Sequence, residues 1–204
     1  MRERQALLLV DLQNDFCAGG ALAVNQGEET IAVANQLAAE FCARGEPVIA
    51  TLDWHPAGHG SFASSAGTQP GTLGELHGLP QVWWPDHCIQ HSQGALLHPA
   101  LNQTLLTLKV YKGENPEIDS YSAFFDNGRR QQTRLYEWLQ QHDITALTVM
   151  GLATDYCVKY SVLDALTLGY QVTVVSAGCR GVNLRADDSE TALAEMAQAG
   201  AKIL

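Results

Sequence analysis

Short apolar runs recur along this chain, and they alternate with segments of helical spacing. The runs lie at residues 6–10, 47–52, 105–111, 146–150 and 171–175, and residues 202–204 begin a sixth. Runs this short and this apolar are typical of strands buried on both faces of a parallel sheet. Alternating strands and helices predict a three-layer α/β/α domain with a six-stranded, mainly parallel sheet.

The segments between the runs predict the helices and one long loop. Apolar residues three and four positions apart indicate helices at 28–44, at 131–142, from 158 to about Gly169, and from Asp187 to Gly200. Asp187 with Glu190 resembles a capping pair for the last helix. Residues 56–104 are rich in Gly, Pro, Ser, Thr and His and show little periodicity, so we expect a long functional loop there.

Size, charge and cysteine content exclude several classes of protein. The 204 residues fit a single domain, 1–204, and the net charge of −10 argues against a nucleic-acid or membrane-surface partner, because both generally require clustered Lys and Arg. No stretch approaches the length of a membrane span. The five cysteines are odd in number and widely spaced, as in a reducing compartment, so we expect a cytoplasmic protein.

Three polar residues each follow a predicted strand or its turn: Asp11, Lys112 and Cys157. The carboxyl ends of parallel strands share one rim of a sheet, so we expect these residues to meet. Cys157 follows a turn in which Thr154 or Asp155 is the expected helix cap, and a helix start favours a thiolate. A carboxylate can take the thiol proton, and a lysine can stabilise negative charge. Each residue alone is better explained as structural; their shared position predicts a cysteine nucleophile.

A second group of polar residues has the composition of a metal site. Asp53 and His55 lie at the end of the run 47–52, and His87 lies in the long loop. A carboxylate with imidazoles suits Zn²⁺, Fe²⁺ or Mn²⁺ and leaves positions open for water or a ligand. The pattern D-x-H alone is a weak signal. Further candidate ligands in the same loop are His59, Ser61 and Ser64.

Five segments of the chain, taken in order, resemble the nicotinamidases, also called pyrazinamidases, of the isochorismatase-like cysteine hydrolases. They are VDLQNDF around Asp11, DWHP at 53–56, WPDHC at 84–88, Lys112-Gly113, and GLATDYCV at 151–158. Each motif is modest, but five in register over essentially the whole chain are specific. The resemblance implies the isochorismatase-like hydrolase fold, with a triad of Asp11, Lys112 and Cys157 and one divalent metal ion on Asp53, His55 and His87.

The resemblance also implies a reaction. Nicotinamide would be hydrolysed to nicotinate and ammonia through a thioester, with the metal on the pyridine nitrogen. Pyrazinamide is expected as a second substrate, and NAD salvage as the role. The family includes monomers and larger assemblies, so a homo-oligomer stays open.

Family members further suggest a ring-binding pocket of Phe16, Trp84 and Tyr121, whereas the role of Tyr156 varies among them. They use a histidine, a glutamate or a serine-held water as fourth metal ligand, and the sequence does not decide between these. A cis peptide bond is expected at Leu152–Ala153, where the N–H groups of Ala153 and Cys157 would face an oxyanion.

Other functions are compatible with the same predicted fold. An amidase for carbamoyl compounds generally lacks the D-x-H motif, and an isochorismatase-type enol-ether hydrolase typically lacks the cysteine. A non-catalytic binding module would have lost a member of the triad, and all three are present. A dinucleotide-binding oxidoreductase is disfavoured because no G-x-G-x-x-G follows the first run.

Overall fold

The computed structural model describes residues 4–204. The main sheet of this part of the chain has the strand order β5-β2-β1-β6-β7-β8, and every neighbouring pair is parallel. Its strands are β1 (Gln5–Val10), β2 (Val48–Asp53), β5 (Leu108–Lys112), β6 (Ala146–Leu152), β7 (Gln171–Arg180) and β8 (Lys202–Ile203). The six-stranded parallel sheet predicted from the sequence is confirmed.

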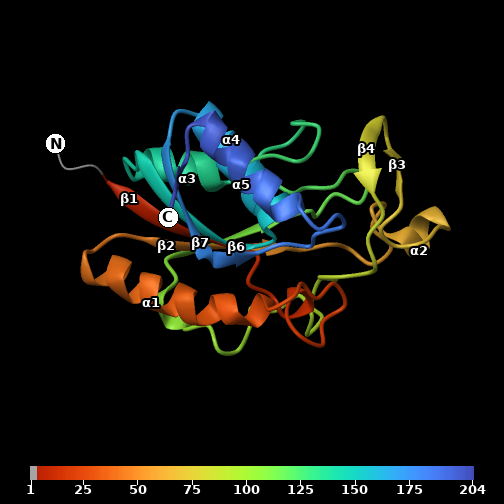
Figure 1. Cartoon of the computed structure of the whole chain (residues 1–204), viewed down its shortest axis with the longest axis horizontal. Helices are drawn as coiled ribbons and strands as arrows, with labels where there is room; N and C mark the ends of the chain where they lie inside the picture. The colour runs from red at the N-terminus through yellow and green to blue at the C-terminus, as the bar shows by residue number, and fades with distance from the viewer. Residues whose placement is uncertain (1–3) are drawn as a thin grey trace.

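Helices cover both faces of this sheet (Figure 1). On one face lies α1 (Thr30–Ala43), and on the other lie α3 (Leu135–Gln141), α4 (Lys159–Thr167) and α5 (Asp188–Ala199). Beyond the end toward which the strands run lie the short helix α2 (Ala63–Ala66) and a hairpin of β3 (Leu73–Leu76) and β4 (Leu79–Val82). The three layers of the predicted α/β/α domain are therefore present.

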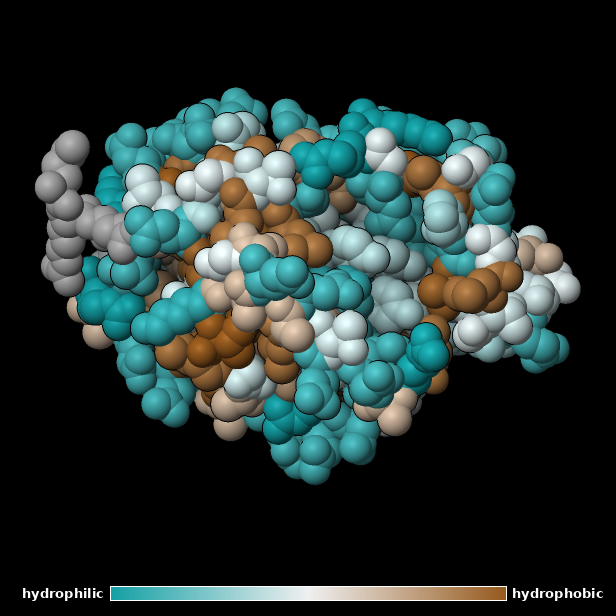
Figure 2. Space-filling view, turned by 45° about the horizontal axis from the view of Figure 1, so that its top comes forward, coloured by the Kyte–Doolittle hydropathy of each residue, from teal (hydrophilic) through white to brown (hydrophobic). Residues whose placement is uncertain are grey.

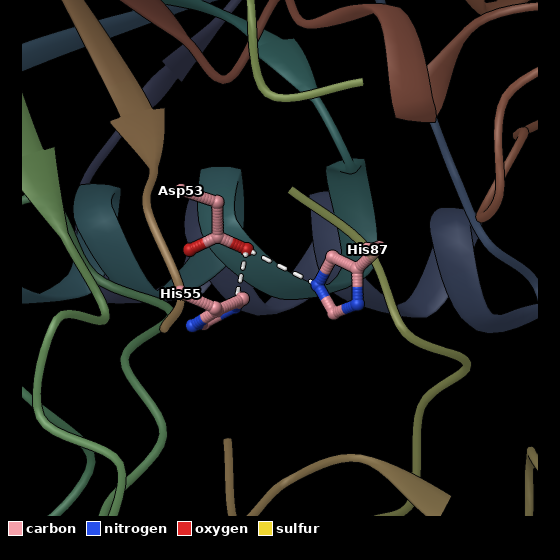
Figure 3. A group of neighbouring side chains, drawn as sticks. All are labelled: Asp53, His55 and His87. Atoms are coloured by element: carbon pink, nitrogen blue, oxygen red, sulfur yellow. Dashed lines mark hydrogen bonds and ion pairs between the residues drawn. The ribbon is translucent and has the colours of Figure 1, made fainter. Parts of the chain in front are cut away.

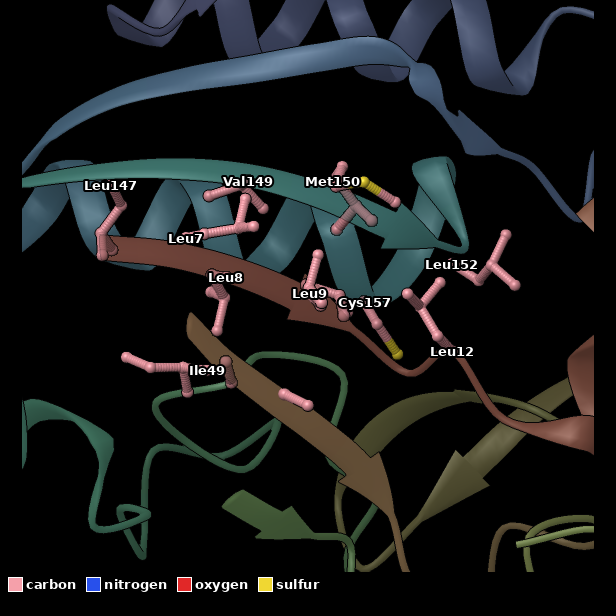
Figure 4. Packing of buried hydrophobic residues seen from close by; sticks show 14 of the residues in the cluster. Leu7, Leu8, Leu9, Leu12, Ile49, Leu147, Val149, Met150, Leu152 and Cys157 are labelled. Carbon is pink, nitrogen blue, oxygen red and sulfur yellow. The ribbon is translucent and has the colours of Figure 1, made fainter. Parts of the chain in front are cut away.

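The central strands consist of residues that avoid water on both faces of the sheet. All six residues of β2 are buried, and β1 is fully buried from Ala6 to Val10. Figure 4 shows the leucines of β1 packed between side chains of β2 and β6, with Cys157 near the carboxyl end of β1. This packing holds the ends of these strands, where the polar residues gather, in fixed positions.

The segment 56–104 differs from the expected loop, because it contains α2 and the β3–β4 hairpin. Strand β3 is mostly exposed, so it lacks the alternation of buried and exposed residues by which a strand is detected in sequence. Pro80 lies inside β4, and proline weakens any strand prediction. The hairpin packs outside the main core, where hydrophobic periodicity carries little information.

Three other boundaries differ from the expectation. The strand expected from residue 105 begins at Leu108 as β5, after a short 3-10 helix at Gln103–Leu105. The helix expected from residue 131 begins at Leu135, because the carboxylate of Asp126 accepts hydrogen bonds from the N–H groups of Gly128, Arg130 and Gln131 and holds them in a turn. The strand expected to end at residue 175 continues to Arg180 as β7.

The expected capping pair of α5 is also wrong. Asp187 is the N-cap residue but makes no side-chain cap hydrogen bond. The carbonyl oxygen of the Asn183 side chain instead accepts hydrogen bonds from the N–H and hydroxyl groups of Ser189. A residue before the helix, folded back onto its first turn, has replaced the local cap.

The surface seen in Figure 2 is largely hydrophilic, and the hydrophobic residues on it form separate patches. Large apolar side chains that remain exposed include Leu73 and Leu184. None of the helices in residues 4–204 is both long enough and apolar enough to cross a membrane.

We predict that Leu8→Ala lowers the free energy of unfolding by about 2–5 kcal/mol, because it leaves a cavity in the centre of β1. Leu8 is fully buried, whereas Leu73 on β3 is 79% exposed. The matched control Leu73→Ala should change stability by less than about 0.5 kcal/mol. Urea denaturation measures both, and equal effects would contradict the assignment of the core.

Candidate active site and metal site

The three residues of the predicted triad meet at the carboxyl edge of the sheet. Asp11 directly follows β1, Lys112 ends β5, and Cys157 lies in the turn between β6 and α4. Lys112 Nζ lies 2.9 Å from Asp11 Oδ2 and 3.3 Å from Cys157 Sγ, and it also donates to the carbonyl of Ser120. All three side chains are buried. Three segments far apart in the chain thus place an acid, an amine and a thiol in contact.

The two carboxylate oxygens of Asp11 have different surroundings. Oδ1 accepts a hydrogen bond of 2.6 Å from the hydroxyl of Thr51, which in turn accepts one from the N–H of Asp11. Oδ2 faces the Lys112 ammonium and has no partner of regular hydrogen-bond geometry in the described part of the chain. Oδ2 is therefore the oxygen at which a proton can be received.

Burial controls the protonation of this triad. It raises the pKa of the Cys157 thiol well above its usual value, and the ammonium of Lys112 opposes it only in part. The direction of this shift is opposite to the thiolate expected from a helix start. Burial also raises the pKa of Asp11, although Lys112 lowers it. A carboxylate with a raised pKa is a better base, and this suits proton transfer from Cys157.

The turn that carries Cys157 is a single π-helical turn, Thr154–Val158, directly before α4. Neither Thr154 nor Asp155 caps it, contrary to the expectation from the sequence, because its N-cap residue is Ala153. The carboxylate of Asp155 instead accepts hydrogen bonds from the N–H groups of Val182 and Asn183. The peptide bond Leu152–Ala153 is cis, as expected.

Asp53, His55 and His87 form a compact group beside the triad (Figure 3). Asp53 Oδ2 lies 3.2 Å from His55 Nε2 and 3.4 Å from His87 Nε2. The three buried side chains each offer a ligand atom within 4.8 Å of the others. Burial raises the pKa of Asp53, but Lys112 and His55 outweigh it and hold that pKa well below its usual value. Asp53 is therefore an anion.

Both imidazoles are oriented in the way that metal-binding histidines require. Nδ1 of His55 lies 2.8 Å from the carbonyl oxygen of Gly113, and Nδ1 of His87 lies 2.7 Å from that of Pro85. Burial lowers the pKa of His55, but the Asp53 carboxylate outweighs it and raises that pKa to about 9, so a cation must displace the Nε2 proton. A neutral imidazole that donates Nδ1–H to a carbonyl then offers its Nε2 lone pair to the ion. One carboxylate and two such nitrogens fit a divalent cation with open coordination positions.

Gly113 has a steric role in this group. Its φ is +74°, and a Cβ atom there would lie 2.5 Å from Cε1 of His55. Any other residue would displace the imidazole or its carbonyl partner. Of these two neighbouring residues, Lys112 belongs to the triad and Gly113 orients a histidine of the metal-ligand group.

The further ligand candidates have other partners. His59 lies with Nδ1 2.8 Å from the hydroxyl of Ser61 and Nε2 2.8 Å from the carbonyl oxygen of Asn115. Both of its nitrogens are thus engaged, and among the described residues the group of potential ligands does not include His59. Ser61 is buried beside it, while the exposed Ser64 donates to Asp86.

A cavity adjoins both the cysteine and the metal-ligand group. The predicted ring-binding residues Phe16, Trp84 and Tyr121 all line it, and so does Tyr156, whose role the sequence left open. The indole N–H of Trp84 donates to the hydroxyl of Tyr121 over 3.2 Å. Residues that sequence reasoning missed in its lining are Leu22, Asp119 and Val182. They lie in irregular segments, where no periodicity indicates the direction of a side chain.

Comparison with known proteins identifies the family. Residues 5–204 match the family described as Isochorismatase domain, and the chain belongs to it. It is 63% identical over 199 residues to the nicotinamidase of Escherichia coli (strain K12). The aligned region covers 98% of this chain and 93% of that protein.

Two solved structures resemble this fold closely. A nicotinamidase and pyrazinamidase of Acinetobacter baumanii has a TM-score of 0.94 and 40% identity, with 100% of this chain and 97% of that chain covered. The pyrazinamidase of Pyrococcus horikoshii in complex with zinc has a TM-score of 0.82 and 32% identity, with 98% of each chain covered.

We predict that the double variant His55→Ala/His87→Ala retains about a tenth or less of the wild-type metal content, because two of three ligands are lost. Mass spectrometry of the purified protein measures metal content, and circular dichroism checks the fold. The matched control is His91→Ala, since this exposed ring packs on Trp54 and does not belong to the group of potential ligands. Full occupancy in the double variant would exclude this metal site.

Proposed function

We propose that this chain is a nicotinamidase, which hydrolyses nicotinamide to nicotinate and ammonia through a thioester on Cys157. The observation that carries the proposal is the position of Lys112 Nζ, 2.9 Å from both Asp11 and Asp53 and 3.3 Å from the cysteine sulfur. This contact joins a nucleophile and its base to a metal-ligand group. The similarity to the E. coli nicotinamidase over nearly the whole chain supports it.

We further propose that Asp53, His55 and His87 hold one divalent ion, which is zinc, iron or manganese. When bound, this ion would take the pyridine nitrogen of the substrate and orient the ring. The zinc complex of the Pyrococcus horikoshii pyrazinamidase supports a metal of this kind. Phe16 and Trp84, both buried in the cavity lining, hold the faces of the ring and exclude water.

The first half of the reaction forms the thioester. Asp11 Oδ2 takes the proton of the Cys157 thiol, and the thiolate attacks the carboxamide carbon. The N–H groups of Ala153 and Cys157 stabilise the oxyanion, a contribution of about 3 kcal/mol for each donor. Asp11 then delivers its proton to the nitrogen, the C–N bond breaks and ammonia leaves. Lys112 keeps its ammonium charge throughout, because Asp11 and Asp53 raise its pKa against the effect of burial.

The second half of the reaction regenerates the enzyme. Asp11, again a carboxylate, takes a proton from a water molecule that attacks the thioester carbon. The C–S bond breaks, the thiolate recovers the proton from Asp11, and nicotinate leaves. One carboxyl group therefore acts in turn as base and acid in both halves.

We also propose the wider role that the sequence suggested. Hydrolysis of nicotinamide would serve NAD salvage, and pyrazinamide has the same carboxamide on a ring with nitrogen at the same position. A single domain of residues 1–204 and a cytoplasmic location, the latter inferred from the cysteine pattern, remain part of this proposal.

We predict that Cys157→Ala lowers kcat for nicotinamide by roughly a thousandfold or more, because the nucleophile is absent. Metal content should equal that of wild type, since Cys157 is outside the metal-ligand group. The matched control is Cys42→Ala, which changes an exposed thiol on α1. Ammonia release measures activity, and near-wild-type turnover in Cys157→Ala would disprove the nucleophile assignment.

We predict that the wild-type protein releases ammonia from nicotinamide and pyrazinamide but acts on benzamide at least about a hundredfold less efficiently. Benzamide has the same carboxamide and ring size and lacks the ring nitrogen. A comparison of kcat/KM for the three amides measures the effect. Equal rates on benzamide would contradict the proposed contact with the ring nitrogen, and no release from nicotinamide would contradict the function itself.

A further inference from the structure

The pairing between β1 and β2 stops before β2 does. Its register runs over Leu7↔Val48, Leu8↔Ile49 and Leu9↔Ala50. On its other side, β2 stays paired with β5 as far as Asp53↔Lys112. The chain leaves β1 at Asp11, whose φ is +50°. The last residue of β2 therefore has a strand neighbour on one side only.

The side chain of Gln13 occupies the missing position. Its Nε2 donates to the carbonyl oxygen of Asp53 over 2.7 Å, and its Oε1 accepts from the N–H of Asp53 over 2.8 Å. A primary amide presents the same donor and acceptor as a peptide group, so Gln13 replaces one residue of a strand. Nε2 also donates to the carbonyl oxygen of Ala95. Gln13 is fully buried, and without it these backbone groups would have no water to bind.

The two carboxylate oxygens of Asp53 contact different parts of the site. Asp53 Oδ1 lies 2.9 Å from Lys112 Nζ, while Oδ2 faces the Nε2 atoms of His55 and His87. A shift of the Asp53 backbone moves both oxygens together. Catalytic and metal-binding side chains lose function when they are displaced by more than about 0.5 Å. The two hydrogen bonds from Gln13 fix the backbone from which this carboxylate extends.

We infer that Gln13 is a positioning residue, which sets the affinity for the metal ion by clamping the backbone of Asp53 in place of a strand. The inference rests on the metal site proposed above. Gln13 touches neither the ion nor the substrate and acts through Asp53. Within the motif VDLQNDF, it connects the segment that carries the catalytic base to the segment that carries a metal ligand.

The test is a Co²⁺ titration of metal-free Gln13→Leu, followed through the visible absorption of the bound ion. Leucine removes all three hydrogen bonds and replaces the amide with an apolar side chain of roughly similar volume. We expect the Co²⁺ concentration at the titration midpoint to be at least about tenfold higher than in wild type, because loss of a residue that supports a metal ligand lowers metal affinity. The absorption spectrum should also change, because the Asp53 backbone is no longer held. The kcat of the Co²⁺-saturated protein should fall as well, since Asp53 also contacts Lys112.

The matched control is Thr30→Val. Thr30 is fully buried and donates a side-chain hydrogen bond to the carbonyl of Gly27, at the start of α1. The Thr30→Val variant loses this buried hydrogen bond and is therefore less stable, but the contacts of Asp53 are unchanged. Its Co²⁺ midpoint and spectrum should match those of wild type, which separates positioning from a general loss of stability.

A second variant, Gln13→Glu, covers the case in which Gln13→Leu fails to fold. Its carboxyl group can still accept from the N–H of Asp53, but it has one O–H donor when protonated and none when ionised, so it cannot donate to both carbonyls and the midpoint should again weaken. Wild-type midpoints and spectra in the variants that fold would overturn the role of Gln13 alone. A wild-type protein that binds no Co²⁺ would overturn this inference together with the proposed metal site.

Discussion

The ammonium group of Lys112 is the interaction on which the rest of the site depends. It is buried, and a buried charge is stable only where opposite charges and acceptors surround it. Asp11 and Asp53 lie at 2.9 Å on two sides, and the carbonyl of Ser120 accepts a third contact. The two carboxylates are thereby brought together despite their mutual repulsion. In the proposed mechanism, Asp11 exchanges a proton with Cys157, and Asp53 is a ligand of the metal ion.

This arrangement requires the sheet to open at its carboxyl edge. The ladder between β1 and β2 ends at Leu9↔Ala50, and side chains take over its hydrogen bonds: Thr51 for the N–H of Asp11, and Gln13 for both backbone groups of Asp53. Beyond this point Lys112 extends from β5 past the end of β2 and reaches Asp11. The proposed catalytic centre thus occupies the place where regular strand pairing stops.

Sequence reasoning succeeded where burial leaves a simple pattern. Fully buried strands are nearly uninterrupted apolar runs, so β1, β2 and β6 were predictable to within two residues at each end. It failed where side chains direct the backbone. Asp126 delays the start of α3, and Asn183 caps α5 from outside the helix. The exposed strand β3 has no face in the core and therefore no recognisable period.

By itself, the sequence determined the parallel sheet and the residue types that its strand ends present, because both follow from hydrophobic pattern and chain order. Motifs in register added the family and candidate roles. Only the tertiary structure decided that burial raises the pKa of the Cys157 thiol, that both nitrogens of His59 have other partners, and that Gln13 holds the backbone of Asp53. These depend on distances and burial between segments far apart in the chain, and no local pattern of residues records them.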